Sequence, residues 1–560
     1  MKKRLISAAL CLLMLVTSIA TASCGKEEVD PNTLEIDGAT ARAMTLTIWG
    51  IKGAGTTDEA VAAVEAAMSS ITEAQFNTAI KLELYSEKDY DKALEKKMDE
   101  IQSQLDLEAA EAEAKKQAEK EAKKNKTETT KAPETSAEET TEIADETILD
   151  EYGLPATLYP EVEDTQLDIF LMTDYDMLLK YQEKGVLSAL DEQLSSSSKL
   201  LKSYIHPTFL TAGKVGGSTV AIINNQPIGE YTFMLMNKSL MDKYYYDPEN
   251  FISFNDAYDF INDVGREEKS YTPFMGDISP VGVNYFTLDG TKTVVGNMLA
   301  PGAVYGDPGE PAVLFANKTW TTYTSNVAKL KKNGYIGAET VKETDKFGVA
   351  IIKGGYEDVA AFEEDYYINV LQAPQGTTEN IYNGMFAVST YTKSLARAME
   401  IVTYLNTRSD LRNLFAYGIQ DVHYTLDKDD VLTKISKDYN MELAYTGNMF
   451  VAHAPEGEPA DYWESFKQQN LDAVLSPYFG FEYTEDMIDT TILKGVIDFS
   501  NRFYNALNTA DTAAMDDFMM DWWDQSDLET SIANWIATDL EDNEKTIGKV
   551  YADWYAKVGK

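Results

Sequence analysis

Aromatic side chains and carboxylates are the residues of this chain whose types and number could support chemistry. Its 560 residues include 33 Tyr, 21 Phe and 7 Trp, beside 92 Asp and Glu. Sugar rings present apolar C–H faces and a rim of hydroxyl groups, so flat rings beside carboxylates, amides or ammonium groups are suited to bind them. Aromatic residues also fill cores, so their number alone does not identify a binding site.

Strand ends are the positions where these residue types matter most, because open α/β sheets place their ligands there. Trp49 and Lys52 close the first predicted strand, and Asp174 and Tyr175 come directly after the third. Core packing is the alternative for each ring. These four residues are our first candidates for ligand contact.

Signals for catalysis are weak. The three histidines, His206, His423 and His453, lie far apart and lack partners at the spacing of zinc ligands. The glycines near position 53 are not followed by the residues that a phosphate loop requires, and no G-x-S-x-G stretch occurs. Acidic pairs are too common here to nominate a glycosidase dyad. We therefore predict no catalytic residue, no metal site and no cofactor.

The first 24 residues have the layout of a secretory signal. A basic head at 1–4 precedes an apolar run at 5–20, and Thr21-Ala22-Ser23-Cys24 follows. The apolar run is shorter than the ~20 residues of a bilayer span. The ending on Cys24 resembles the lipobox of bacterial lipoproteins, in which that thiol is acylated, typically with palmitate. An ordinary signal peptide and an uncut membrane anchor are the alternatives.

The formal charge of −43 bears on the partners of the protein. A surface this acidic repels nucleic-acid phosphates and anionic lipid head groups, so we predict no nucleic-acid partner. Cys11 and Cys24 are the only cysteines, which leaves none for a disulfide after the signal is removed. A chain of this length can instead be held together by its own core.

Periodicity and composition predict strands that alternate with helices, which indicates an α/β sheet between helical layers. A capping box at Thr56 and Glu59 begins the first predicted helix and gives a β-α-β opening. The predicted strands are 44–50, 80–85, 167–171 and 219–223, and the predicted helices include 254–264, 393–405, 410–417, 484–507 and 512–555.

The segment 106–160 differs in composition from its surroundings. Beyond Leu107 the apolar stripe of a predicted helix fades into Ala, Glu and Lys, and 125–147 is rich in Thr, Glu and Pro. Such a stretch buries too little apolar surface to offset the entropy of ordering. We predict a helical and disordered acidic insertion that acts as a spacer, with a partner-binding arm as the alternative.

Several segments, taken in order, resemble the extracellular solute-binding lipoproteins of ABC importers. The resemblance is to the carbohydrate-binding branch that includes maltose-binding protein, and to its longer Gram-positive members. The matching segments are Ile48-Trp49-Gly50, Asp168-Ile169-Phe170, 185–190, Val220 to Ile223, Met236-Asn237-Lys238, 383–388, 417–424 and 470–481.

This resemblance implies an α/β, two-lobed, periplasmic-binding-protein-like fold of type II, with hinge-linked lobes and a ligand cleft between them. The predicted divisions are a signal peptide at 1–23, a tether at 24–43, lobe 1 at 44–105 and 161–225, the insertion at 106–160, lobe 2 at 226–384, a lobe 1 return segment at 385–445, and a mainly helical C-terminal part of lobe 2 at 446–560.

The resemblance also extends the set of candidate site residues. It places a cleft-facing acid at Asp174 and a stacking aromatic at Tyr478 and Phe479, while Glu230 and Tyr231 lie beyond the first crossing between lobes. The predicted ligand-binding residues are Trp49, Lys52, Asp174, Tyr175, Glu230, Tyr231, Trp320, Tyr356, Tyr478 and Phe479.

The function implied by the resemblance is that of a monomeric receptor on the extracellular face of the bacterial membrane, anchored by a lipid on Cys24. It would capture a carbohydrate, in particular an oligosaccharide, and deliver it to ABC permease subunits. Three alternatives stay open: a glycoside hydrolase or other carbohydrate-active lipoprotein, an importer receptor for a peptide or another solute, and a surface adhesin or scaffold.

Overall fold

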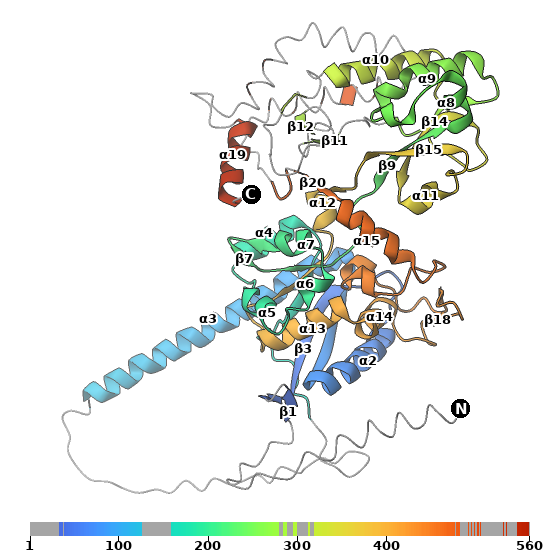
Figure 1. The fold of residues 1–560 in the computed structure, drawn as a ribbon. Coiled ribbons are helices and arrows are strands. Elements are labelled where there is room, and N and C mark those ends of the chain that lie inside the picture. Colours follow the sequence, from blue (N-terminus) through green and yellow to red (C-terminus); the bar gives the residue numbers. More distant parts are fainter. Residues whose placement is uncertain are drawn as a thin grey trace, which may run out of the picture.

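The computed structural model of the chain describes residues 33–36, 39–125, 158–278, 284–287, 295–299, 312–313, 318–476, 478–481 and 546–558, with single residues between 491 and 534. They form two lobes, one above the other in Figure 1. The predicted signal peptide, Cys24, most of the tether, the segment 126–157 and most of the two predicted helices after 483 lie outside the described residues.

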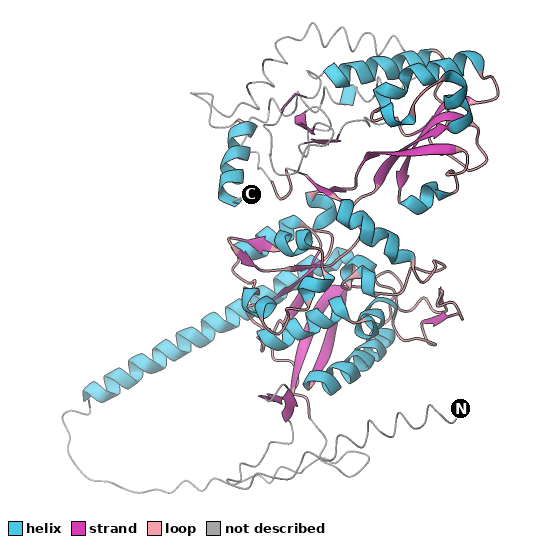
Figure 2. Cartoon of the chain, in the orientation of Figure 1, coloured by secondary structure: helices cyan, strands magenta, loops and turns pink. Residues whose placement is uncertain are grey.

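The first lobe is built on a five-stranded sheet with the order β4-β3-β5-β17-β8 (Figure 2). Its strands are β3 (Met44–Ile51), β4 (Thr78–Tyr85), β5 (Ile169–Met172), β17 (Met385–Val388) and β8 (Ile222–Ile223). β3 is parallel to β4 and β5, whereas β17 is antiparallel to β5 and β8. The three parallel strands therefore bring their carboxyl ends to one edge, which faces the second lobe (Figure 1).

Helices cover both faces of this sheet and complete one continuous apolar core around it. The helices of the first lobe are α2 (Asp58–Phe76), α3 (Glu87–Asn125), α4 (Tyr175–Glu183), α5 (Asp191–Ser195), α6 (Leu201–Tyr204), α7 (Pro207–Ala212), α13 (Leu395–Thr407) and α14 (Ser409–Tyr417). Short hairpins lie at its margin: β1 (Thr33–Ile36) with β2 (Ala39–Arg42), β6 (Lys214–Val215) with β7 (Ser218–Thr219), and β18 (Tyr424–Leu426) with β19 (Leu432–Lys434).

The start of α2 corrects one detail of the sequence analysis. Thr57, and not Thr56, is the N-cap, because its side chain accepts a hydrogen bond from the backbone N–H of Ala60 at 3.2 Å. The hydroxyl of Thr56 instead donates to the carbonyl of Asn440 at 2.9 Å. The predicted capping box is therefore wrong: the N-cap lies one residue later, the N3 residue is Ala60, and the Thr56 side chain binds a distant loop instead.

The second lobe has a four-stranded sheet with the order β10-β14-β9-β15. Its strands are β10 (Thr272–Gly276), β14 (Phe347–Gly354), β9 (Tyr231–Asn237) and β15 (Tyr366–Gln372). Alternate residues of β9 enter different cores: Met234 and Met236 pack on one face, and Phe233 and Leu235 on the other. This two-residue period is that of a strand buried on both faces.

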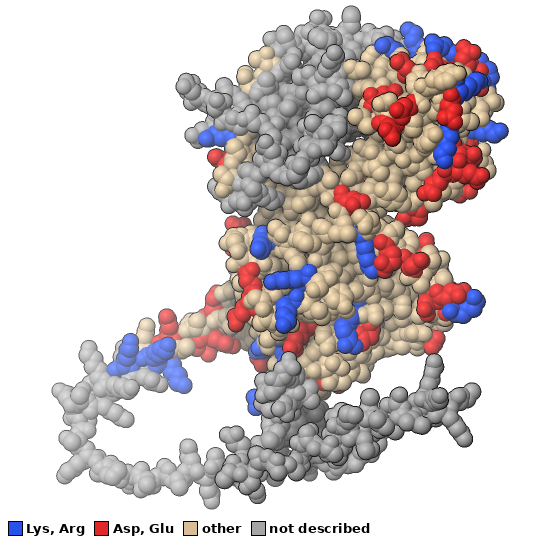
Figure 3. All heavy atoms as spheres, viewed as in Figure 1, with Lys and Arg blue, Asp and Glu red and all other residues tan. Residues whose placement is uncertain are grey.

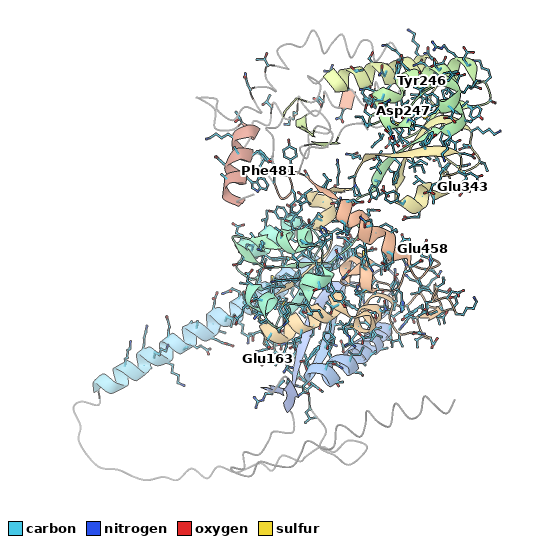
Figure 4. The ribbon with its side chains drawn as sticks, in the orientation of Figure 1. Glu163, Tyr246, Asp247, Glu343, Glu458 and Phe481 are labelled. Atoms are coloured by element: carbon cyan, nitrogen blue, oxygen red, sulfur yellow. The ribbon has the colours of Figure 1, made fainter. Side chains whose placement is uncertain are left out.

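The remaining described elements of the second lobe are helices and a separate small sheet. They are α8 (Lys238–Tyr244), η2 (Pro248–Asn250), α9 (Phe254–Glu267), α10 (Lys318–Lys332), α11 (Tyr356–Ala360), α19 (Ile547–Val558), and the three-stranded sheet of β11 (Asn284–Thr287), β12 (Val295–Leu299) and β13 (Ala312–Val313). The helices α8, α9 and α10 pack on the face of Met234 and Met236, whereas α11 packs on the face of Phe233 and Leu235. Phe481 contacts α19 through Tyr551 and Trp554 (Figure 4).

The helix α3 runs out of the first lobe and away from the second (Figure 1). Only its first turns are anchored, by Tyr90, Leu94, Met98 and Ile101, all buried in the lobe 1 core. The side chains described from Gln102 onward are exposed. Within the described part of the chain, no helix has both the length and the apolarity that a membrane span requires.

Candidate functional site

In the part of the chain that the structure describes, three segments cross between the lobes. The first crossing (224–230) joins β8 to β9, and the second (373–384) joins β15 to β17 through β16 (Gln375–Gly376) and α12 (Thr378–Ile381). The third follows α15 (Tyr462–Asp472) and contains β20 (Val474–Leu475). β16 and β20 pair in parallel, so the second and third crossings are hydrogen-bonded to each other.

The end of α15 is fastened to the first crossing. The side chain of Asn470, which is 2% exposed, accepts from the N–H of Ile228 at 2.8 Å and donates to the carbonyl of Gln226 at 2.7 Å. Gln469 donates to the carbonyl of Gly229. Two successive amides of one helix thus fix the backbone of the first crossing.

A cavity of about 620 Å³ lies beside the first and second crossings, at the carboxyl edge of the lobe 1 sheet. Its size falls in the range of roughly 300–1,000 Å³ that is usual for small-molecule sites. The lining residues come from the loop after β5, the first crossing and the region of α12, and they are Thr173, Asp174, Tyr175, Asp176, Gln226, Pro227, Thr378, Glu379, Asn380 and Asn383.

Asp174 is placed in this cavity by two local structures. It follows β5 at the sheet edge, and it is the N-cap of α4, where it accepts from the N–H of Met177 at 2.8 Å. Its second oxygen accepts from the hydroxyl of Thr173 at 3.1 Å. Because the helix N-terminus favours negative charge, the carboxylate is both oriented and stabilised as an acceptor.

Three aromatic rings stack at the edge of the cavity, and we call them the cleft ring stack. The ring centroids of Tyr175 and Tyr382 lie 4.5 Å apart with the planes tilted by 32°, and those of Tyr382 and Phe479 lie 5.2 Å apart with the planes only 4° apart. The three rings come from α4, from the end of α12 and from the segment after the third crossing. Tyr175, which lines the cavity and is half-buried, is the ring that a ligand could reach.

The amides of the lining are held by the crossings themselves. Gln226 donates to the carbonyl of Asn383 at 2.6 Å, which joins the first crossing to the second. Asn380 donates to the carbonyl of Gln375 at 2.7 Å. A rotation of one lobe against the other would therefore move these polar groups together with the hinge.

Tyr445 is a neutral phenol near Asp174 and two further carboxylates. Burial raises the pKa of its phenol, and the carboxylates of Glu87, Glu442 and Asp174 raise it further. The second crossing packs closely here: Gly384 has φ +94°, and a Cβ at this position would lie 2.3 Å from the carbonyl of Ala444. Only glycine fits that approach without a shift of the backbone.

Of the residues predicted from sequence, the structure brings Asp174, Tyr175 and Phe479 together. Trp49 lies in the lobe 1 core, stacked on Tyr85 at 5.3 Å, and its ring N–H is buried without a partner among the described residues. Lys52 forms an ion pair with Asp58 at 2.8 Å. Neither Trp49 nor Lys52 is among the residues that line the cavity.

The other predicted residues lie in different surroundings. Tyr231 is buried and donates to the carboxylate of Asp472 at 2.6 Å, and Tyr356 packs on it at 4.9 Å. Glu230 is exposed beside them, and Tyr478 is buried against Tyr551. The side chain of Trp320 lies outside the described residues.

The sequence analysis missed Gln226 and Asn380, which line the cavity, and Tyr382, which packs on Tyr175. All three lie on crossing segments that carry no periodic pattern. The resemblance identified 383–388 as a return crossing. The residues just before that segment could therefore have been chosen as candidates for the cleft. Within the described ranges, no cluster of three or more His, Cys, Asp or Glu side chains is arranged to hold a metal ion.

No family model matches the chain, but comparison with known proteins finds a similar sequence and a similar structure. The chain is 20% identical over 349 residues to the carbohydrate ABC transporter substrate-binding protein of Streptococcus pneumoniae serotype 4, covering 58% of this chain and 69% of that protein. Its structure is similar to that of the N-glycan transport solute binding protein of Streptococcus pneumoniae, with a TM-score of 0.53 and 15% identity over 92% of this chain and 98% of the other. The resemblance to the solute-binding proteins of ABC importers is therefore confirmed, and the chain has their two-lobed α/β fold.

Proposed function

We propose that this protein is the substrate-binding component of an ABC importer and that it captures an oligosaccharide between its lobes. The observation that carries the proposal is the cavity at the carboxyl edge of the lobe 1 sheet, where Tyr175 lies beside Asp174 and the amides of two crossings. The name of the similar pneumococcal protein supports a carbohydrate as the ligand.

The residues of the cavity suit the two kinds of surface that a sugar presents. The ring of Tyr175, backed by Tyr382, offers a flat face for the C–H groups of a pyranose. The carboxylates of Asp174, Asp176 and Glu379 can accept hydrogen bonds from hydroxyl groups. The ligand favours closure of the lobes only to the extent that the closed form binds it more tightly than the open form does.

The proposal includes several features that follow from the sequence. They are the lipid on Cys24, the location on the outer face of the membrane, the monomeric state, the permease as a partner and the absence of catalysis. We also keep the lobe boundaries and the ligand contacts of the other candidate residues as predictions from the sequence. α15 contacts the first crossing and thus lies where the lobes meet.

Isothermal titration against a panel of ligands tests the proposal. The panel contains N-glycan fragments, malto-oligosaccharides and peptides, and small-angle X-ray scattering with and without the best ligand measures closure. We expect micromolar or tighter binding of an oligosaccharide and a decrease in the radius of gyration.

Two outcomes would contradict this function. Binding of peptides alone would refute a carbohydrate as the ligand but would remain consistent with a receptor of an ABC importer. Release of reducing sugar during incubation with the bound oligosaccharide would instead identify a glycoside hydrolase.

A further inference from the structure

The outer part of α3 concentrates positive charge in a chain that is otherwise strongly acidic. Between 115 and 126 the sequence contains six lysines and two glutamates, whereas the whole chain carries a net charge of −43. The described side chains of Lys115, Lys116 and Lys120 are exposed. Figure 3 shows basic side chains gathered at the far end of the projecting helix.

This end of α3 lacks the means to bind a protein through apolar contacts. Leu107 is the last large apolar residue of the helix, and alanine is the only apolar residue type after it. A coiled coil would require large apolar residues at a and d positions, and they are absent from this stretch of the sequence. What the surface offers a partner is therefore charge.

The length of α3 separates this charge from the acidic body. Ile101 is the last of the residues that anchor the helix in the core. At 1.5 Å per residue, Lys115 stands about 21 Å and Lys124 about 35 Å beyond it. The Debye length at physiological salt is about 8 Å, so repulsion between the acidic lobes and an anionic surface is largely screened at that distance.

We propose that the outer end of α3, defined by the exposed side chains of Lys115, Lys116 and Lys120, is a docking surface for anionic phospholipid head groups. α3 leaves the first lobe on the side away from the second lobe, where the β1–β2 hairpin also lies (Figure 1). This hairpin lies within the predicted tether of residues 24–43, so the lysines and this part of the predicted tether are on the same side of the body. A membrane that approaches this side meets the lysines before it meets the acidic lobes.

Sedimentation with vesicles tests the proposal on the mature chain carrying Cys24→Ser, which removes any contribution of a lipid anchor. We expect it to bind vesicles that contain phosphatidylglycerol more tightly than vesicles of phosphatidylcholine alone, and to be released by high salt. The triple change Lys115→Gln, Lys116→Gln and Lys120→Gln should reduce partitioning by about tenfold or more.

The matched control changes three exposed lysines outside the arm, Lys199, Lys342 and Lys428, to Gln. It loses the same charge and should bind almost as well as the parent. Equal binding to both kinds of vesicle, or an equal loss in the control, would overturn the proposal. So would tighter binding of soluble polyphosphate than of vesicles, because the arm would then bind a phosphate polymer. Circular dichroism of both triple variants verifies that α3 remains helical.

Discussion

Two groups of aromatic rings near the crossings consist of similar side chains in different surroundings. The cleft ring stack (Tyr175, Tyr382 and Phe479) borders a cavity lined by carboxylates and amides. The second group, which we call the hinge ring cluster, consists of Tyr231, Phe233 and Tyr356 at the start of the lobe 2 sheet. In this cluster the hydroxyl of Tyr231 donates a hydrogen bond to the carboxylate of Asp472 in α15.

The difference shows what makes an aromatic residue part of a site. Tyr175 and Tyr356 both begin short helices and both keep part of the ring exposed. Only Tyr175 has polar side chains from other segments converging beside it in a cavity. Tyr356 packs on the buried ring of Tyr231, which binds Asp472 at the hinge. The exposed part of the Tyr356 ring is therefore the outer surface of a packed cluster and not part of a binding site.

A second cavity, of about 510 Å³, extends the comparison to the α15 side of the first crossing. His206, Asn225 and Asn470 are among its lining residues. Asn225 precedes Gln226, which lines the first cavity. Two adjacent residues of the first crossing therefore line different cavities. Gln226 lines the cavity beside the cleft ring stack, and Asn225 lines the cavity beside α15.

The largest effect is expected on the α15 side of the hinge. Asn470→Ala removes two hydrogen bonds and leaves a buried N–H and a buried carbonyl of the first crossing without their partner. We expect the free energy of unfolding to fall by about 2–4 kcal/mol. Urea denaturation measures this change.

The matched control is Gln468→Ala on the same helix, which removes one exposed contact with Asp472. Its expected cost is below about 0.5 kcal/mol. Equal costs for the two variants would mean that α15 does not fasten the crossing.

The next effect concerns affinity and compares Tyr175→Ala with Tyr356→Ala. Loss of the Tyr175 ring should weaken binding of the oligosaccharide by about 10- to 100-fold, whereas loss of Tyr356 should weaken it by less than about threefold. Isothermal titration gives both values, and thermal melting verifies folding. Similar losses for both would support the sequence-based assignment of Tyr356 to the ligand and refute the distinction between the two ring groups.

The sequence could predict strands and the residues that follow them, but not the distant partners of the rings in the two groups. The predicted strand 44–50 matches β3 closely, because its apolar and β-branched composition is a local signal. Asp174 and Tyr175 were found because they directly follow a strand. The partners of Tyr231 and Tyr382 were not predictable in this way: Asp472 is 241 residues from Tyr231, and contacts at such a separation leave no local pattern.

A smaller effect is expected from acid, and again on the α15 side. Burial lowers the pKa of His206 and of His453 below the usual 6.5. Both therefore stay neutral in the folded protein at a pH where the unfolded chain binds protons. Their contribution to stability is complete above pH 6.5 and is lost as the pH falls through their folded pKa values.

Urea denaturation between pH 7.5 and pH 5.5 measures this loss as a decrease in the free energy of unfolding towards pH 5.5. His206 also accepts a hydrogen bond from the N–H of Thr208 as the N-cap of α7, and protonation would remove that acceptor. His206→Gln should make the pH dependence shallower. An unchanged slope in this variant would show that His206 does not contribute.

The smallest effect tests the bond that distinguishes the hinge ring cluster. Burial raises the pKa of Tyr231 and the Asp472 carboxylate raises it further, so the phenol stays protonated and donates to that carboxylate at 2.6 Å. Tyr231→Phe keeps the ring packed on Phe233 and removes only the donor. We expect a loss of about 0.5–1.5 kcal/mol in the free energy of unfolding, because Asp472 is exposed and water can replace the phenol.

A double-mutant cycle with Asp472→Ala isolates this bond from the packing of the ring. If the bond fastens α15 to the start of β9, the double variant is about as stable as Asp472→Ala alone, and the coupling energy equals the loss measured for Tyr231→Phe. Additive losses would mean that the two side chains act independently. The hinge ring cluster would then differ from the cleft ring stack only in its packing, and Asn470 would remain as the contact through which α15 holds the crossing.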